Sequence, residues 1–273
     1  MPPVKFDDIP KVATAVLSDD YQVSGCVLKT KQTTSWGGSV LSSQVDLFSD
    51  AKCATPSKLT WRLPTPFGCP MFVIDKLEMD KGGKYKLETS TDKAYPGLKI
   101  ECKSDLADIN KTTVGCTYSG VKNLQVIMNH KLTKPQDFTG EATYTCPVAV
   151  CGVKFTSAVL SGGLPDFGVR FLKGPFFGSV TAKEKLAVYT AHCMYQATPE
   201  VKLAATYQHG GKGSGSGSLA ISCKGLYKVK VSQDQTVCCS VKHSVTKGFT
   251  VLAGAKYGVA KGDLSYGLQL SVE

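Results

Sequence analysis

Apolar and polar residues alternate without a break along the last ten residues of the chain, which spell LSYGLQLSVE. Every second side chain from Leu264 to Val272 is apolar, and the residues between them are small or polar. This period of two is typical of a β-strand that has one apolar face. Such a strand needs apolar surroundings on one side only, which strongly restricts how the rest of the chain can fold.

The same alternation recurs along almost the whole chain. About nineteen strand-like segments follow Tyr21, and short turn signals rich in glycine and proline separate them. Connections this short join antiparallel neighbours. Open sheets rarely exceed ~10 strands, whereas a closed barrel leaves no edge unpaired. The sequence therefore predicts an all-β fold, a closed antiparallel transmembrane β-barrel of about 19 strands. Two stretches fit less well, because prolines crowd residues 64–70 and residues 176–195 alternate poorly.

One helical segment precedes these strands. Residues 3–18 place Phe6, Ile9 and Val16 near one face of a helix. Pro10 limits that helix, which is expected to break there or to begin close to it. We divide the chain into a helical segment, 1–20, and a barrel, 21–273, since no change of composition suggests a second domain.

Composition excludes some classes of protein. No apolar run approaches the ~20 residues that a membrane-spanning helix needs, so a helical membrane protein is excluded. The first residues lack the pattern of a secretory signal peptide, and acids such as Asp7 and Asp19 argue against a transit peptide. The 11 cysteines are expected to serve mainly as small apolar residues in a reducing compartment.

The formal net charge of +10 implies an anionic partner. Basic residues recur singly in the polar rows of successive strands, a layout that argues against a nucleic-acid patch. If these rows line a lumen, the lumen is strongly positive; a solvated outer face of a soluble sheet is the alternative. The basic strand residues expected to line a pore are Lys29, Lys31, Lys58, Arg62, Lys84, Lys86, Lys99, Lys103, Lys202, Lys228, Lys230 and Lys242.

Three motifs carry a resemblance to a known family. The stretch PGLKIECKSDL at 96–106 is similar to a Gly-Leu-Lys signature, and LKTK at 28–31 resembles the start of that family's first strand. The last strand fits the sorting signal of mitochondrial barrels at Ser265, Gly267, Leu270 and Val272. In this order and spacing, the chain resembles the eukaryotic porins of the mitochondrial outer membrane, the voltage-dependent anion channel family, over essentially its full length.

The resemblance implies a barrel of 19 strands, the odd number known for this mitochondrial channel. The stretch FDDIPKVA resembles the family's lumenal helix, so Phe6, Ile9 and Val16 would anchor it to the wall and Lys11 would be a charge in the pore. The family's glycine-rich hinge is replaced here by residues 18–22, and Pro10 departs from the pattern. Helix mobility and voltage gating are therefore left open.

The implied function is passive diffusion of small solutes across the mitochondrial outer membrane, with anions such as phosphate, ATP and ADP preferred. Lysine and arginine in the lumen would lower the electrostatic barrier for anions. No catalytic residue, cofactor or metal site is expected, and the expected partners are small anions, membrane lipids and a homo-oligomer or larger membrane complex. The alternatives are a protein-import pore of the same superfamily, an occluded barrel that is a structural subunit, and a soluble ligand carrier.

Chemical motifs are weak in this sequence. The glycine-rich stretch 210–218 lacks the Ser or Thr that follows the lysine of a phosphate-binding loop, so a flexible connection is expected. His192 next to Cys193 does not match a zinc spacing.

One acidic residue breaks the apolar pattern. Asp75 shares a row with Val73 and Leu77, which would direct its carboxylate toward lipid, where a charge is costly and usually functional. Many family members carry an acid at the matching place. A bulge that returns the carboxylate to water is the second interpretation, and the sequence does not choose between them.

Overall fold

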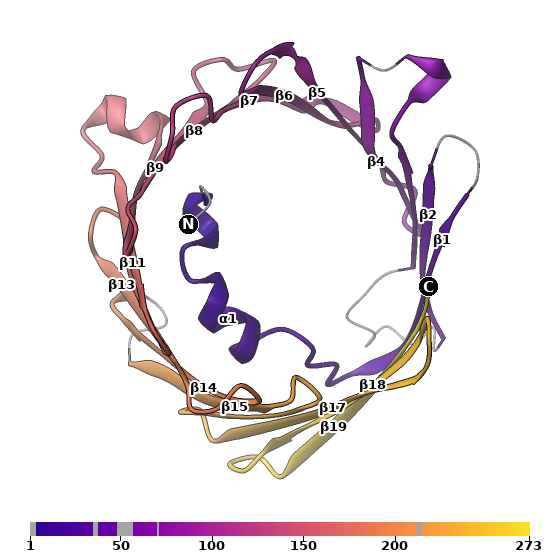
Figure 1. Ribbon diagram of the computed structural model, residues 1–273, viewed down its shortest axis with the longest axis vertical. Coiled ribbons are helices and arrows are strands. Elements are labelled where there is room, and N and C mark those ends of the chain that lie inside the picture. Colours follow the sequence, from indigo (N-terminus) through magenta and orange to yellow (C-terminus); the bar gives the residue numbers. More distant parts are fainter. Residues whose placement is uncertain (1–3, 35–37, 48–56, 70, 212–214) are drawn as a thin grey trace.

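The chain forms a closed barrel of 19 strands with a helical segment inside the ring (Figure 1). The computed structural model describes residues 4–34, 38–47, 57–69, 71–211 and 215–273, so parts of the predicted segment 1–20 and of the stretch 210–218 lie outside it. Each strand pairs with its neighbours in the sequence. The expected barrel and strand number are confirmed.

The elements follow one another around the ring in chain order. The helices are η1 (Phe6–Asp8), α1 (Lys11–Leu17), η2 (Pro66–Gly68) and η3 (Ser157–Ser161). The strands are β1 (Gly25–Thr33), β2 (Val40–Asp46), β3 (Lys58–Leu63), β4 (Val73–Asp80), β5 (Tyr85–Tyr95), β6 (Leu98–Asp105), β7 (Asp108–Tyr118), β8 (Leu124–Lys131), β9 (Phe138–Thr145), β10 (Ala149–Thr156), β11 (Asp166–Lys173), β12 (Phe176–Lys183), β13 (Val188–Gln196), β14 (Val201–His209), β15 (Ser216–Cys223), β16 (Tyr227–Ser232), β17 (Thr236–Thr246), β18 (Phe249–Gly258) and β19 (Asp263–Val272).

The barrel closes through a parallel pair, β1 with β19, in which Lys29 pairs with Ser271. This pair departs from the expected all-antiparallel arrangement. Its cause is the odd number of strands: when neighbours alternate in direction, the first and last strands of an odd set point the same way. Closure then requires one parallel pair.

The outer face of the barrel is apolar. In β14 to β16 the outward row contains Leu203, Tyr207, Ile221 and Val229, and in β19 it contains Tyr266, which is 78% exposed. No helix of the described residues is long and apolar enough to cross a membrane.

The N-terminal segment runs inside the ring, with α1 beside β14 and β15 (Figure 1). Pro10 is the residue that precedes α1, where a missing N–H costs little, and η1 lies on its other side. The expected interruption at Pro10 is therefore confirmed. The proline-rich connection 64–70 contains η2 between β3 and β4, and its last residue, Pro70, lies outside the described residues.

The stretch 176–195, which alternates poorly, nevertheless forms β12 and β13. Its lumenal side chains include Phe177 and Met194, which are buried together with Val16 and Leu17 of α1. Both faces of these strands therefore contact apolar groups, on one side the helix and on the other the outer surroundings. The alternation is therefore weak at the place where the helix covers the lumenal face.

Candidate functional site

Most of the predicted basic residues lie on the lumenal face. Directly paired residues of neighbouring strands share a face, and Ala220, which contacts α1 in the lumen, pairs with Lys230. Following the register around the ring from this pair places on the lumenal face the side chains of Lys29, Lys31, Lys58, Arg62, Lys86, Lys99, Lys103, Lys202, Lys228, Lys230 and Lys242.

Two predicted residues lie elsewhere. Lys84 lies in the turn between β4 and β5, at the rim of the barrel and not in its wall. Lys11 is the first residue of α1, is largely exposed, and forms an ion pair of 3.3 Å with Asp8.

The sequence analysis missed further lumenal bases. Arg170 of β11 faces Ser179, and Lys256 of β18 faces Cys238, both on the inner row. Lys154 of β10 also lies on this row. The alternation could have identified them, because each of these residues stands an even number of positions from the polar residues of its own strand and therefore shares their face.

The lumen wall formed by β3 to β6 is a network of ion pairs. Glu78 contacts Lys76 at 2.7 Å and Lys58 at 3.5 Å, and Glu101 contacts Lys99 at 2.9 Å and Lys103 at 3.5 Å. Because these carboxylates alternate with the ammonium groups, this wall contributes much less positive potential than its lysines alone suggest.

The opposite wall is differently charged. Lys202, Lys230 and Lys256 lie on the lumenal faces of β14, β16 and β18, and like Lys29 they form no ion pair among the described residues. The uncompensated positive charge of the lumen therefore includes the arc from β14 through the seam to β1, together with Arg62 of β3 and Arg170 of β11, which also form no ion pair among the described residues.

Two glycines of the barrel wall leave room for the apolar side chains that hold the N-terminal segment. Phe6 and Ile9 are buried, and they lie against Gly152 of β10 and Gly168 of β11, which pair with each other across the two strands. A Cβ atom on Gly168 would lie 2.8 Å from Ile9 Cδ1 and 3.1 Å from Phe6 Cε2. The predicted anchors Phe6, Ile9 and Val16 are all buried against the wall, and only side chains as small as glycine leave room for the first two.

Replacing Gly168 with valine should displace the first turn of the N-terminal segment from the wall. Overpacking of this kind costs roughly 1–3 kcal/mol, so the backbone amides of residues 6–17, other than Pro10, should exchange with solvent deuterium about tenfold faster or more. The matched control is Gly217→Val in β15, on the outer face, where an added Cβ meets nothing nearer than 3.4 Å. Equal exchange in both variants would contradict the role of Gly168 in leaving room for Phe6 and Ile9.

Lys228 holds the end of the helical segment. Its Nζ donates hydrogen bonds to the carbonyl oxygens of Ala15 and Asp19, both at 3.0 Å, and to Asp20 Oδ2 at 3.3 Å. The side chain is only 8% exposed. Its expected place on the inner wall is correct, but its charge is covered by the N-terminal segment and is not presented to the open lumen.

Asp20 and Tyr21 complete this attachment. Asp20 also pairs with Lys242 at 3.3 Å, and Lys230 lies 5.5 Å from the centre of the Tyr21 ring. Burial alone would raise the pKa of Asp20, but the charges of Lys228 and Lys242 and their hydrogen bonds outweigh it and hold that pKa below its ordinary value. Burial raises the pKa of Tyr21 to about 12, so its hydroxyl stays protonated at neutral pH.

The expectation of a lipid-facing carboxylate at Asp75 is wrong. Neighbouring residues Ile74 and Lys76 pair with Thr89 and Glu88, so Asp75 is the extra residue of a β-bulge in β4. Its carboxylate lies 3.9 Å from Nζ of Lys99 on the lumenal face. The bulge changes the direction of this side chain, which simple alternation cannot predict.

The residues of the sorting motif divide between the two faces of β19. Ser265 and Gly267 lie on the lumenal row, whereas Leu270 and Val272 lie on the outer row. A Cβ on Gly267 would lie 2.6 Å from the backbone nitrogen of Ser24. The close approach of the chain that enters β1 is thus a structural reason for this glycine, independent of any sorting role, which remains a prediction.

Comparisons with known proteins do not show a family for this chain. No protein-family model and no curated protein sequence matches the chain. Among solved structures, a triple mutant of the Rhodopseudomonas blastica porin is 11% identical with a TM-score of 0.47, covering 72% of this chain and 90% of that one. Another mutant of the same porin is 10% identical with a TM-score of 0.48 and covers 72% and 91%. Scores and identities this low do not identify a relative.

Proposed function

We propose that this protein is a porin-type channel through which small anions diffuse across an outer membrane. The observation that carries the proposal is the opposite character of the two faces of the closed barrel. The outward rows are apolar, as lipid contact requires, and the inward rows carry lysines and arginines that outnumber the acids there. A soluble carrier with so large an exposed apolar surface would aggregate.

The preferred solutes follow from the lumen charge. Uncompensated ammonium groups such as Lys29, Lys202 and Lys256 lower the energy of an anion in the pore and raise that of a cation. Phosphate, ATP and ADP are the expected physiological cargo, on the resemblance to the mitochondrial channel family. The same resemblance supports the mitochondrial outer membrane as the location.

The test is the reversal potential of the refolded protein in a planar bilayer under a KCl gradient. A stable conductance with chloride preference is expected. Cation preference would overturn the anion part of the proposal. A well-folded barrel that does not conduct would favour a structural subunit with a closed lumen, a role with which the wall attachment of the N-terminal segment through Lys228 and Asp20 is compatible.

The location needs a separate measurement. The full chain should co-fractionate with mitochondria and resist carbonate extraction, and protease added to intact mitochondria should reach the turns on one side of the barrel without any detergent. Recovery in the soluble fraction would contradict both the membrane and the mitochondrial assignment.

A further inference from the structure

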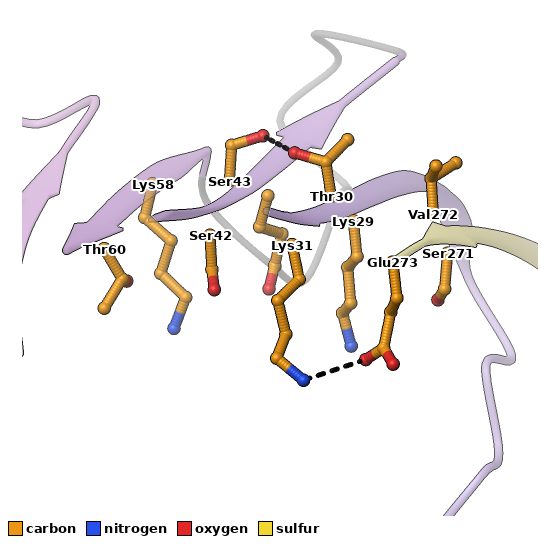
Figure 2. A pocket seen from close by; sticks show the side chains of 11 residues that line it. Lys29, Thr30, Lys31, Ser42, Ser43, Lys58, Thr60, Ser271, Val272 and Glu273 are labelled. Carbon is orange, nitrogen blue, oxygen red and sulfur yellow. Dashed lines mark hydrogen bonds and ion pairs between the residues drawn. The ribbon is translucent and has the colours of Figure 1, made fainter. Parts of the chain in front are cut away.

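A pocket of about 220 Å³ lies in the lumen wall where β19, β1, β2 and β3 run side by side (Figure 2). In Figure 2 the side chains of Lys29, Lys31 and Lys58 extend in the same direction; Ser42 lies between Lys58 and Lys31, and Thr60 lies on the other side of Lys58. Thr30 and Ser43 point to the other side of the wall and hydrogen-bond to each other at 2.7 Å. The register assigns the lysine side to the lumen. The pocket has far more room than the ~30 Å³ that one liquid water occupies.

The charge of this pocket is positive. Lys31 pairs with the Glu273 carboxylate at 3.4 Å, and Lys58 pairs with Glu78 at 3.5 Å. Glu78 is closer to Lys76, at 2.7 Å, so its charge is shared with a lysine outside the pocket. Lys29 has no ion pair among the described residues. The three ammonium groups therefore exceed the negative charge available to neutralise them.

The donors in the pocket suit one kind of anion. Lysine ammonium groups bind phosphate as point charges, and the hydroxyl groups of Ser42, Thr60 and Ser271 add hydrogen-bond donors. The residues that line it include no arginine fork for a planar carboxylate and no aromatic ring on which a nucleobase could stack. The composition favours the phosphate group and leaves a nucleobase without a specific partner.

We propose that this pocket is a binding site for a phosphate group, either free or at the end of a nucleotide, and that the Glu273 carboxylate competes with it for Lys31. This inference rests on the proposed function and specifies where in the pore the cargo is held. The lysine side chains are partly exposed, at 52% for Lys31 and 39% for Lys58, so the binding is weak. Weak binding suits a pore, because a solute must leave a site as readily as it enters.

The experiment titrates inorganic phosphate into the full chain in a phosphate-free non-ionic detergent without lipid, followed by phosphorus NMR line broadening. The double variant K31Q/K58Q should weaken binding by about fivefold or more, roughly 1 kcal/mol. The matched control K202Q/K256Q removes the same charge from β14 and β18, at lumenal positions that do not line the pocket, and should change binding less than about twofold. Glu273→Gln should strengthen binding, because a competitor for Lys31 is lost.

Several outcomes would contradict the proposed site. Equal weakening of phosphate binding by the two double variants would mean that phosphate responds only to the general charge of the lumen. Competition should be equal for ATP and GTP and undetectable for adenosine, and a preference for one base would contradict recognition through phosphate alone. In a second arm with micelles that contain an anionic phospholipid, dependence on Lys31 and Lys58 for the lipid but not for free phosphate would assign the pocket to a headgroup instead.

The proposed function and this site fail separately. A chloride-preferring conductance together with phosphate binding that is unaffected by K31Q/K58Q would leave the pore intact and remove the site. Phosphate binding that depends on both lysines in a barrel that does not conduct would keep the site and remove the pore.

Discussion

Replacing Lys228 with methionine should detach the end of the helical segment from the barrel wall. The variant loses the hydrogen bonds to the carbonyl oxygens of Ala15 and Asp19 and the ion pair with Asp20. It leaves the carbonyl oxygens of Ala15 and Asp19 without this donor, whereas Asp20 keeps its ion pair with Lys242 at 3.3 Å. Loss of the donor from these two covered carbonyl oxygens costs about 1–3 kcal/mol, so we expect the segment to be released while the barrel stays folded.

The measurement is limited trypsin digestion of the refolded protein, because Lys11 lies exposed at the start of α1 and is cut only when the helix leaves the wall and unwinds. Cleavage after Lys11 should become about tenfold faster or more in the variant. Lys202→Met is the matched control, since Lys202 lies on the lumenal face of β14 without an ion pair among the described residues. Similar cleavage rates in both variants would show that Lys228 does not hold the segment.

On the proposed function, reversing uncompensated charges of the lumen should change the selectivity of the pore from anions to cations. The triple variant K29E/K202E/K256E changes the formal charge by two at each of three lumenal positions that lack an ion pair among the described residues. A unit charge about 10 Å from an ion in water contributes roughly 0.4 kcal/mol before screening. After screening by ~0.1 M salt, the triple change shifts the barrier for each ion by about 1 kcal/mol, or roughly fivefold.

The reversal potential under a KCl gradient should therefore change sign in this triple variant. The control K84E/K122E/K261E carries the same change of net charge in the exposed turns at the rims, where Lys84 and Lys261 lie between strands. That control should retain chloride preference with a smaller shift. If both triple variants shift the potential equally, net charge and not the lumen arc determines selectivity.

The strands could be predicted from the sequence because the two faces of each strand lie in different surroundings. A barrel strand has water on one side and apolar surroundings on the other, so its residues alternate with a period of two. Residues 264–272 follow this rule closely, and the structure places the row with Tyr266 outside and the row with Ser265 in the lumen. The alternation is weak at 176–195 because α1 covers Phe177 and Met194 on the lumenal side and because a turn at 184–187 interrupts the stretch.

The site could be predicted in part. Alternation along the strand alone placed residues such as Lys29 and Lys202 on the lumenal side, since a charge has a much lower free energy in water than in lipid. Alternation failed at Asp75, where a bulge inserts one extra residue and reverses the direction of the side chain. It also could not tell Lys228 from Lys202, because the difference lies in which of them the N-terminal segment covers.

Local alternation was enough to predict the face of most strand residues, with Asp75 in the bulge of β4 as an exception. Which lumenal charges remain uncompensated depends on the three-dimensional arrangement of the chain. Ion pairs such as Lys99 with Glu101, and the attachment of Asp20 to Lys228, join residues whose distances depend on register, on the bulge and on the path of the N-terminal segment. Coulomb energy depends on separation in space, and separation along the chain does not give it.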